Sequence, residues 1–137
     1  MTLPGHTDPS GARPDVELRL PADGAYVSVL RTLTAGLAAR LDFTIDDIED
    51  LRMAVGEACA MVLPEADPGT DLTGRFALAP GRLTVSVAVR ASQPSPPDHD
   101  SFAWQVLTTL ASSATVSTAE GELVVTLVMT PDAATGA

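Results

Sequence analysis

The segment 51–61, with the sequence LRMAVGEACAM, carries the side chains of this chain that most readily suggest chemistry. Glu57 is a carboxylate that could serve as a general base, and Cys59 is the only thiol. On a helical wheel Glu57 lies away from the apolar stripe, so it is either a solvated carboxylate or a catalytic one. Cys59 falls on the apolar stripe, which favours a small core residue over a redox switch.

The standard motifs of metal, nucleotide and hydrolase sites are missing from the sequence. It has no CxxC, no HExxH and no paired histidines, because His6 and His99 are far apart, so we expect no metal site. It has no GxxxxGK(S/T) or GxGxxG to cradle phosphates, and no GxSxG to mark a nucleophile. Any site must therefore be argued from the elements that carry the segment 51–61.

The N-terminal half predicts one strand followed by two helices. Residues 15–20 alternate apolar and polar side chains, which is typical of a half-buried strand. Asp23 can cap a first helix, and Thr44 with Asp47 forms the capping-box pattern of a second helix that ends at Pro64. The expected apolar stripe of the first helix comprises Tyr26, Val29, Leu30, Leu33, Leu37 and Leu41. That of the second comprises Ile48, Leu51, Val55, Ala58, Cys59 and Val62.

The C-terminal half predicts two hairpins separated by a loop and a helix. Alternating residues from 76 to 90 turn at Pro80-Gly81, and those from 114 to 129 turn at Glu120-Gly121. Between them lie a proline-rich loop at 91–100 and a helix capped by Ser101, with its apolar residues at Phe102, Val106, Leu107 and Leu110. This order predicts an α+β fold: a two-layer α/β sandwich whose mixed, mostly antiparallel sheet carries three helices on one face.

The segment 51–61 resembles the N-box helix of the anti-sigma factors of the serine-kinase type, a branch of the histidine-kinase-like (GHKL) ATPases. That helix reads roughly LxxAVxEACxNAV, and the matching residues here are Ala54, Val55, Glu57, Ala58 and Cys59. The order of elements agrees over about residues 15–130. The segment 101–110 looks like the helix after the ATP lid, especially that of actinobacterial members.

The resemblance also implies a role for several positions. Glu57 would act as the base or orient the nucleophile, but the asparagine that holds Mg²⁺ four residues later is Met61, and a thioether is a poor ligand for Mg²⁺. Where the family has its adenine-binding DxGxG, this chain has Arg90-Ala91-Ser92-Gln93. The glycine-rich phosphate turn is replaced by the acidic segment 98–102. We therefore expect Met61, Arg90 and Ser92 to occupy a degenerate nucleotide site, without ATP, Mg²⁺ or another cofactor.

The function that this resemblance implies is partner binding. We expect an anti-sigma factor that sequesters a sigma factor as a homodimer and is released by an anti-anti-sigma protein of the STAS type, without efficient kinase activity. The alternative is an active ATP- and Mg²⁺-dependent serine kinase that phosphorylates the anti-anti-sigma protein. A third hypothesis is a scaffold, or a domain for another ligand.

Four further residues have two interpretations each. Arg31 and Arg40 could pair with an acidic partner or could simply be solvated. Trp104, the only tryptophan, is either an interface anchor or a core residue. Met61 either fills the vacated nucleotide pocket or is an ordinary methionine at the edge of the core.

Composition limits the partners and the compartment. The formal net charge is -10 with no lysine and scattered arginines, which disfavours direct nucleic-acid binding and suits a partner with a basic face, although acidity also serves solubility alone. One cysteine excludes an internal disulfide. We expect a tail at 1–14 that is no signal peptide, a domain at 15–130 and a tail at 131–137. No apolar run is long enough for a membrane helix, so the expected location is the cytoplasm.

Overall fold

The computed structural model describes residues 13–131. The predicted tails at 1–14 and 131–137 therefore fall almost wholly outside the described residues, and the domain limits 15–130 stay a prediction. In the described part, no helix is both long enough and apolar enough to span a bilayer.

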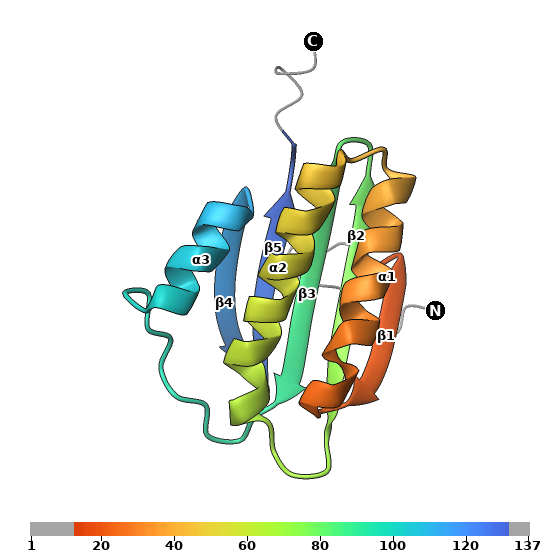
Figure 1. Cartoon of the computed structure of the whole chain (residues 1–137). Helices are drawn as coiled ribbons and strands as arrows, with labels where there is room; N and C mark the ends of the chain where they lie inside the picture. Colours follow the sequence, from red (N-terminus) through yellow and green to blue (C-terminus); the bar gives the residue numbers. More distant parts are fainter. Residues whose placement is uncertain (1–12, 132–137) are drawn as a thin grey trace.

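One five-stranded sheet forms the back layer of the molecule (Figure 1). Its strands are β1 (Val16–Pro21), β2 (Asp71–Ala79), β3 (Arg82–Arg90), β4 (Ser113–Ala119) and β5 (Glu122–Met129), in the order β1-β2-β3-β5-β4. Each neighbouring pair is antiparallel, so the predicted mixed sheet is wholly antiparallel in the described chain. The two tight hairpins explain two of these pairings, because a short turn can join only antiparallel strands.

Three helices cover one face of the sheet, as predicted (Figure 1). They are α1 (Val27–Arg40), α2 (Ile45–Val62) and α3 (Phe102–Leu110), with 3-10 turns at Gly24–Tyr26 before α1 and Leu63–Glu65 after α2. The predicted cap of α3 is confirmed, because Ser101 accepts from the Trp104 N–H at 3.1 Å. Asp23 accepts from the Ala25 N–H at 2.8 Å and so caps the 3-10 turn that leads into α1, not α1 itself. The Thr44 hydroxyl accepts from the Asp47 N–H at 3.1 Å and donates to the Asp47 carboxylate at 2.8 Å.

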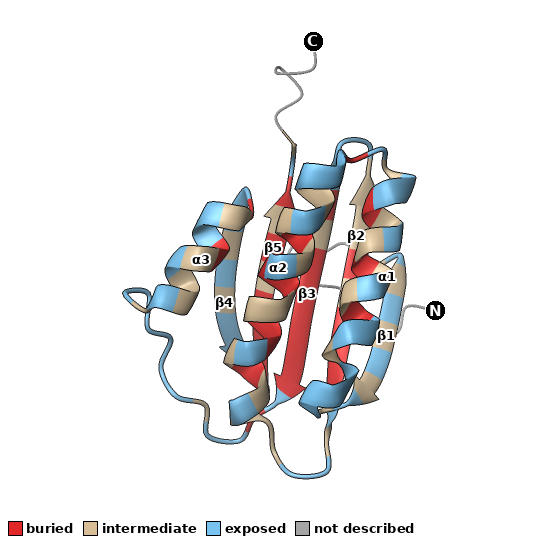
Figure 2. Ribbon diagram, in the orientation of Figure 1, coloured by how far each residue is buried: buried red, intermediate tan, exposed pale blue. Residues whose placement is uncertain are grey.

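The core lies between the helices and the sheet, with α2 in the centre of the helical layer (Figure 2). The predicted face of α2 is confirmed except that Ile48 is only partly buried, and the fully buried Ala54 was not predicted. The stripe predicted for α1 is wrong in part, because the fully buried residues are Leu30, Thr34 and Ala38, whereas Tyr26 and Val29 are exposed. Thr34 is accommodated in the core because its hydroxyl donates to the Leu30 carbonyl at 2.8 Å.

Glycine at position 74 lets α1 approach the sheet closely. Gly74 lies in β2, opposite Leu18 of β1 and Val87 of β3, on the face of the sheet that meets Leu30 of α1. A Cβ atom built there would lie 2.5 Å from the Leu30 Cδ1. This contact sets how tightly α1 packs against the sheet.

Candidate functional site

A small cavity lies where α2 ends, between that helix, the 91–100 loop and strands β4 and β5. It encloses about 170 Å³. Its lining comprises Met61, Val62, Glu65, Ser95, Pro96, Pro97, Asp98, Ser101, Val116, Leu123 and Val125. Met61 thus lies between α2 and the 91–100 loop, where the family resemblance predicts a nucleotide pocket, and its replacement of a ligand stays a prediction.

Two carboxylates tie the 91–100 loop to the connection between α2 and β2. The Ser95 N–H donates to Glu65 Oε1 at 2.7 Å. Asp67 accepts from the Ser92 N–H at 3.0 Å and from the Ser92 hydroxyl at 2.7 Å, and its own N–H donates to the Arg90 carbonyl at 2.7 Å. The hydrogen bonds from Ser92 lower the pKa of Asp67 below its ordinary value. The loop is therefore held as a fixed wall of the cavity.

Sequence reasoning missed both Glu65 and Asp67. Asp67 and Ser92 are 25 positions apart, and neither stands in a motif. Only the antiparallel return of β2 and β3 brings the two segments together, so no local pattern could have indicated the contact.

Glu57 does not line the cavity with Met61. It is half-buried on α2, and its carboxylate forms no hydrogen bond or ion pair with another residue of the described range 13–131. Its predicted catalytic role stays a prediction. Cys59 is fully buried, and burial raises the pKa of its thiol to about 12, against a smaller opposing effect of Arg31. The prediction of a core residue is confirmed for Cys59, since such a thiol stays protonated and inert.

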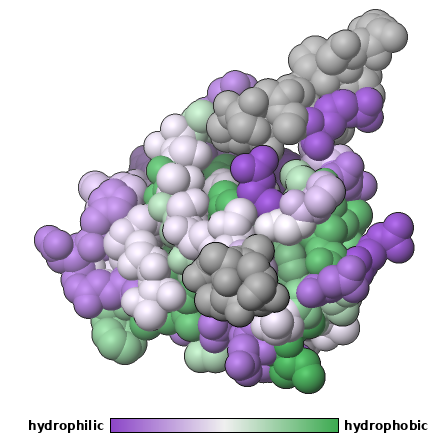
Figure 3. Space-filling model, turned by 90° about the horizontal axis from the view of Figure 1, so that it is seen from above, coloured by the Kyte–Doolittle hydropathy of each residue, from purple (hydrophilic) through white to green (hydrophobic). Residues whose placement is uncertain are grey.

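The two arginines predicted as partner contacts lie at separate places. Arg31 belongs to α1, and its side chain reaches α2: its Cδ is 3.7 Å from the position of a Cβ on Gly56, and its Nε is buried without a hydrogen-bond partner among residues 13–131. Arg40 lines an open groove of about 700 Å³ where α1 ends near the β2–β3 turn. Figure 3 looks onto this end of the molecule and shows hydrophobic and hydrophilic surface side by side. The structure therefore does not join Arg31 and Arg40 in one surface.

Aromatic residues gather at the start of α3 instead. Trp104 is half-buried against the core, and its ring meets His99 edge-on at a centroid distance of 4.8 Å. Phe102, predicted to face the core, is 81% exposed. The prediction fails for Phe102 because α3 is short and buries mainly its other side through Leu107. Phe102 is the most exposed large apolar side chain among the described residues.

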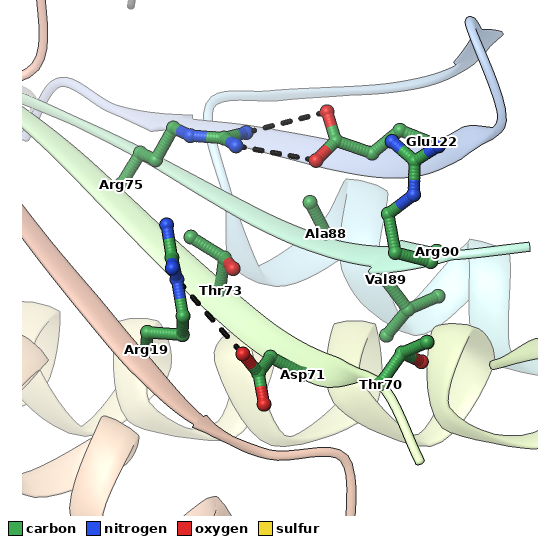
Figure 4. Close-up of a pocket in the computed structure, with 9 residues that line it drawn as sticks. All are labelled: Arg19, Thr70, Asp71, Thr73, Arg75, Ala88, Val89, Arg90 and Glu122. Atoms are coloured by element: carbon green, nitrogen blue, oxygen red, sulfur yellow. Dashed lines mark hydrogen bonds and ion pairs between the residues drawn. The ribbon is translucent and has the colours of Figure 1, made fainter. Parts of the chain in front are cut away.

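The structure divides the predicted nucleotide positions between two faces of the sheet. In β3, Val89 points into the core and Arg90 points to the face without helices, where it lines a different cavity (Figure 4). Ser92 lies beyond the strand and is bonded to Asp67. Met61, Arg90 and Ser92 therefore do not converge on one pocket in this structure.

The lining of the Met61 cavity is apolar and acidic. Its charged lining residues are Glu65 and Asp98, and no arginine lines it. Among residues 13–131 no cluster of three or more His, Cys, Asp or Glu side chains could hold a metal ion. Such a wall repels phosphate and offers it no cationic donor.

Relatives in sequence are serine-protein kinases named RsbW, although no protein-family model matches the chain. The chain is 38% identical over 76 residues to RsbW of Bacillus subtilis strain 168, a match covering 53% of this chain and 48% of that protein. It is 40% identical over 76 residues to RsbW of Bacillus cereus strain ATCC 10987, covering 53% of this chain and 47% of the relative. The chain thus spans about half the length of the curated relatives that it matches.

Solved structures share the fold at lower identity. The RsbU and RsbW domains of Rv1364c from Mycobacterium tuberculosis match with a TM-score of 0.65 and 19% identity, over 86% of this chain and 33% of that one. The histidine kinase domain of the blue-light activated histidine kinase from Erythrobacter litoralis EL346 matches with a TM-score of 0.56 and 14% identity, over 82% of this chain and 62% of that one. The resemblance to actinobacterial members in particular stays a prediction. The predicted resemblance itself is confirmed: the chain has a histidine-kinase-like fold and is similar in sequence to the RsbW serine-protein kinases.

Proposed function

We propose that this protein is an anti-sigma factor that sequesters a sigma factor, is released by an anti-anti-sigma protein of the STAS type, and works without efficient kinase activity. The observation that carries the proposal is the 38% identity to RsbW over 76 residues. Because the chain spans about half of those relatives, partners and activity belong to the proposal. We place this work in the cytoplasm, with the protein as a homodimer.

The cavity beside Met61 supports the absence of efficient ATP use. Its volume of about 170 Å³ is below the roughly 300 Å³ at which small-molecule pockets begin. Glu65 and Asp98 face any phosphate group with negative charge, and Met61 supplies no hard oxygen for Mg²⁺. The hydrogen bonds of Ser92 with Asp67 and of Ser95 with Glu65 hold the 91–100 loop beside the cavity. Enlargement of the cavity would break these bonds.

The surface around α3 supports partner binding. Phe102 is the first residue of α3, whose start is fixed by the Ser101 cap and by the Asp100 N–H, which donates to Asp98 at 2.9 Å. An exposed aromatic side chain at a fixed helix start loses little entropy on binding, and aromatic residues dominate interface hot spots. Residues 91–137 contain no arginine or lysine, so Asp98 and Asp100 flank Phe102 without compensating positive charge. A basic face with an apolar pocket, such as a sigma factor could present, complements this surface.

The test is binding between the purified full chain and the purified sigma factors of its own organism, by calorimetry. We expect one sigma factor to bind at submicromolar concentration and to be displaced by a STAS protein without ATP. Phe102→Ala should weaken the complex by about tenfold or more, whereas Ile45→Ala, at a residue that is 78% exposed on α2, serves as the matched control. Failure of every sigma factor to bind refutes the proposal.

The second candidate is the active serine kinase, which the printed name of the RsbW relatives favours. It predicts micromolar binding of ATP with Mg²⁺, a loss of binding in Glu57→Ala, and transfer of phosphate to a serine of the STAS protein. Calorimetry with ATP and Mg²⁺ separates the two candidates directly, because our proposal expects no saturable heat.

A further inference from the structure

A second cavity lies on the sheet face that no helix covers, at β1, β2, β3 and β5 (Figure 4). It encloses about 310 Å³, which reaches the range of small-molecule sites. Three of the chain's eight basic residues line it: Arg19, Arg75 and Arg90. Carboxylates of Glu17, Asp71 and Glu122 lie within 4.0 Å of Arg19 or Arg75 and balance most of this charge, so the question is which arginine donors stay free.

The register of the sheet builds the cavity. Thr73 pairs with Arg19 on one side and with Ala88 on the other, and Arg90 follows two residues after Ala88. Thr73 and Ala88 are both buried and form a floor of small side chains. From ordinary strand spacing and rise, the Cα atoms of Arg19 and Arg90 are about 12 Å apart, so the two long side chains can meet above this floor.

One of the three arginines is already committed. Arg75 Nη2 and Nη1 lie 3.2 Å and 3.5 Å from the two carboxylate oxygens of Glu122, and the Arg75 side chain is only 24% exposed. This bidentate pair holds β2 to β5 across β3 and leaves Arg75 few donors to offer. Arg75 therefore acts as a structural wall of the cavity.

The other two arginines keep free donors. The Arg19 side chain is 63% exposed and lies 3.6 Å from Glu17 and 4.0 Å from Asp71, both beyond hydrogen-bond distance. Arg90 forms no ion pair within 4.0 Å among the residues that the structure describes, although Glu122 lies opposite it in the strand register. A Cβ atom at position 121 would lie 2.8 Å from the Arg90 Nη2. Because residue 121 is glycine, the Arg90 guanidinium has room there. Two guanidinium groups thus flank the floor from opposite sides.

We propose that this cavity binds a phosphate group, with Arg19 and Arg90 donating from opposite sides and the Thr73 hydroxyl below. A tetrahedral phosphate has enough oxygens for two planar guanidinium forks, whereas a carboxylate has only two. Glu17 lies beside Arg19 and Arg75, so the three arginines face three carboxylates, and the free donors of Arg19 and Arg90, not a net positive charge, would hold the anion. The small volume suits inorganic phosphate or a small phosphate monoester. The site lies on the opposite face from Met61 and does not depend on the proposed anti-sigma function.

The test is an NMR titration of the ¹⁵N-labelled full chain at constant pH and ionic strength, with chloride as the reference anion. Inorganic phosphate and O-phosphoserine are the two probes, and they distinguish a free phosphate from a monoester as the preferred source. We expect saturable shifts in the millimolar range that centre on the amides of Thr73, Ala88 and Arg90. Arg19→Gln and Arg90→Gln should each weaken binding about tenfold, as expected for one lost charge-assisted pair.

Arg82→Gln is the matched control, because Arg82 is an exposed arginine on the same strand as Arg90 at its far end. Both test residues are exposed, so unchanged spectra elsewhere will show that the variants remain folded. Shifts that grow linearly without saturation, or equal affinity in Arg90→Gln and Arg82→Gln, overturn the proposal.

Discussion

Substitution of Gly74 by alanine tests whether contact between α1 and β2 limits the packing of the core. The new Cβ would lie 2.5 Å from the Leu30 Cδ1 and 3.3 Å from the Phe76 Cε1. Carbon atoms pack best at roughly 3.5–4.0 Å, so Leu30 must move by about 1 Å or more. Leu30 and Phe76 are both fully buried, which leaves neither side chain free space to move into.

The expected cost follows from other overpacked cores. Adding a methyl group to a tightly packed core lowers the free energy of unfolding by about 1–3 kcal/mol. With a urea dependence of about 2 kcal/mol per molar, the midpoint of unfolding should fall by roughly 1 M. The assay is equilibrium unfolding in urea, followed by circular dichroism and by the fluorescence of Trp104, the only tryptophan.

Two controls make this prediction specific to the Leu30 contact. Gly36→Ala adds the same methyl group to α1, where no atom lies within 4 Å, and should instead stabilise the protein by about 0.5–1 kcal/mol. Leu30→Ala alone should cost about 2–5 kcal/mol, and the double variant should cost less than the sum, because the clashing atom is gone. Strictly additive effects, or a Gly74→Ala variant as stable as the wild type, would refute the reasoning.

Three further predictions concern the loop, the thiol and the exposed aromatic residue. The Asp67 pKa is lowered from 3.8, so its bonds to Ser92 contribute stability above that pH, and this stability is lost as pH falls through the depressed folded pKa. The Ser92 amide should therefore exchange more slowly than its intrinsic rate at pH 6, lose that protection in strong acid, and lack it at both pH values in Asp67→Ala. Cys59 should not react with a thiol reagent at pH 8 until the protein unfolds, and fast labelling of the native chain would contradict its burial. Phe102→Ser should leave the thermal midpoint within about 2 °C of the wild type, because the side chain is exposed, and a large fall would place Phe102 in a packed contact.

Local signals predicted the elements of this fold well. Helix starts at Asp23, Thr44 and Ser101 depend on hydrogen bonds within three residues, and the capping residues make those bonds in the structure. The hairpin turns depend on one or two residues such as Gly81 and Gly121, both at positive φ. Such features are visible in sequence because cause and effect lie close together in the chain.

The candidate site was less predictable, because its contacts join distant segments. The orientation of α3, and with it the exposure of Phe102, depends on which side of a short helix meets β4 and α2. The pairing of Asp67 with Ser92 requires two strands to return to the same end of the sheet. Alternation along β3 does place Arg90 on the sheet face opposite Val89. The family resemblance assigned Arg90 to the nucleotide site by its position in the motif, without regard to that face.

Restoring a single nucleotide-binding residue should fail to restore ATP binding. Met61→Asn would supply the oxygen ligand that the resemblance assigns to Mg²⁺, at the wall of the existing cavity. The carboxylates of Glu65 and Asp98 would still face the phosphates, and the cavity would still be held at its present size by the bonds at Ser92 and Ser95.

We therefore expect no saturable heat when Met61→Asn is titrated with ATP and Mg²⁺, and Met61→Leu provides a control of similar volume. Micromolar binding by Met61→Asn but not by Met61→Leu would show that one ligand alone separates this chain from an active kinase. Our account of the acidic wall would then be wrong, whereas sequestration of a sigma factor would remain to be judged by its own binding experiment. The two outcomes are separable because Phe102 lies outside the lining of the Met61 cavity.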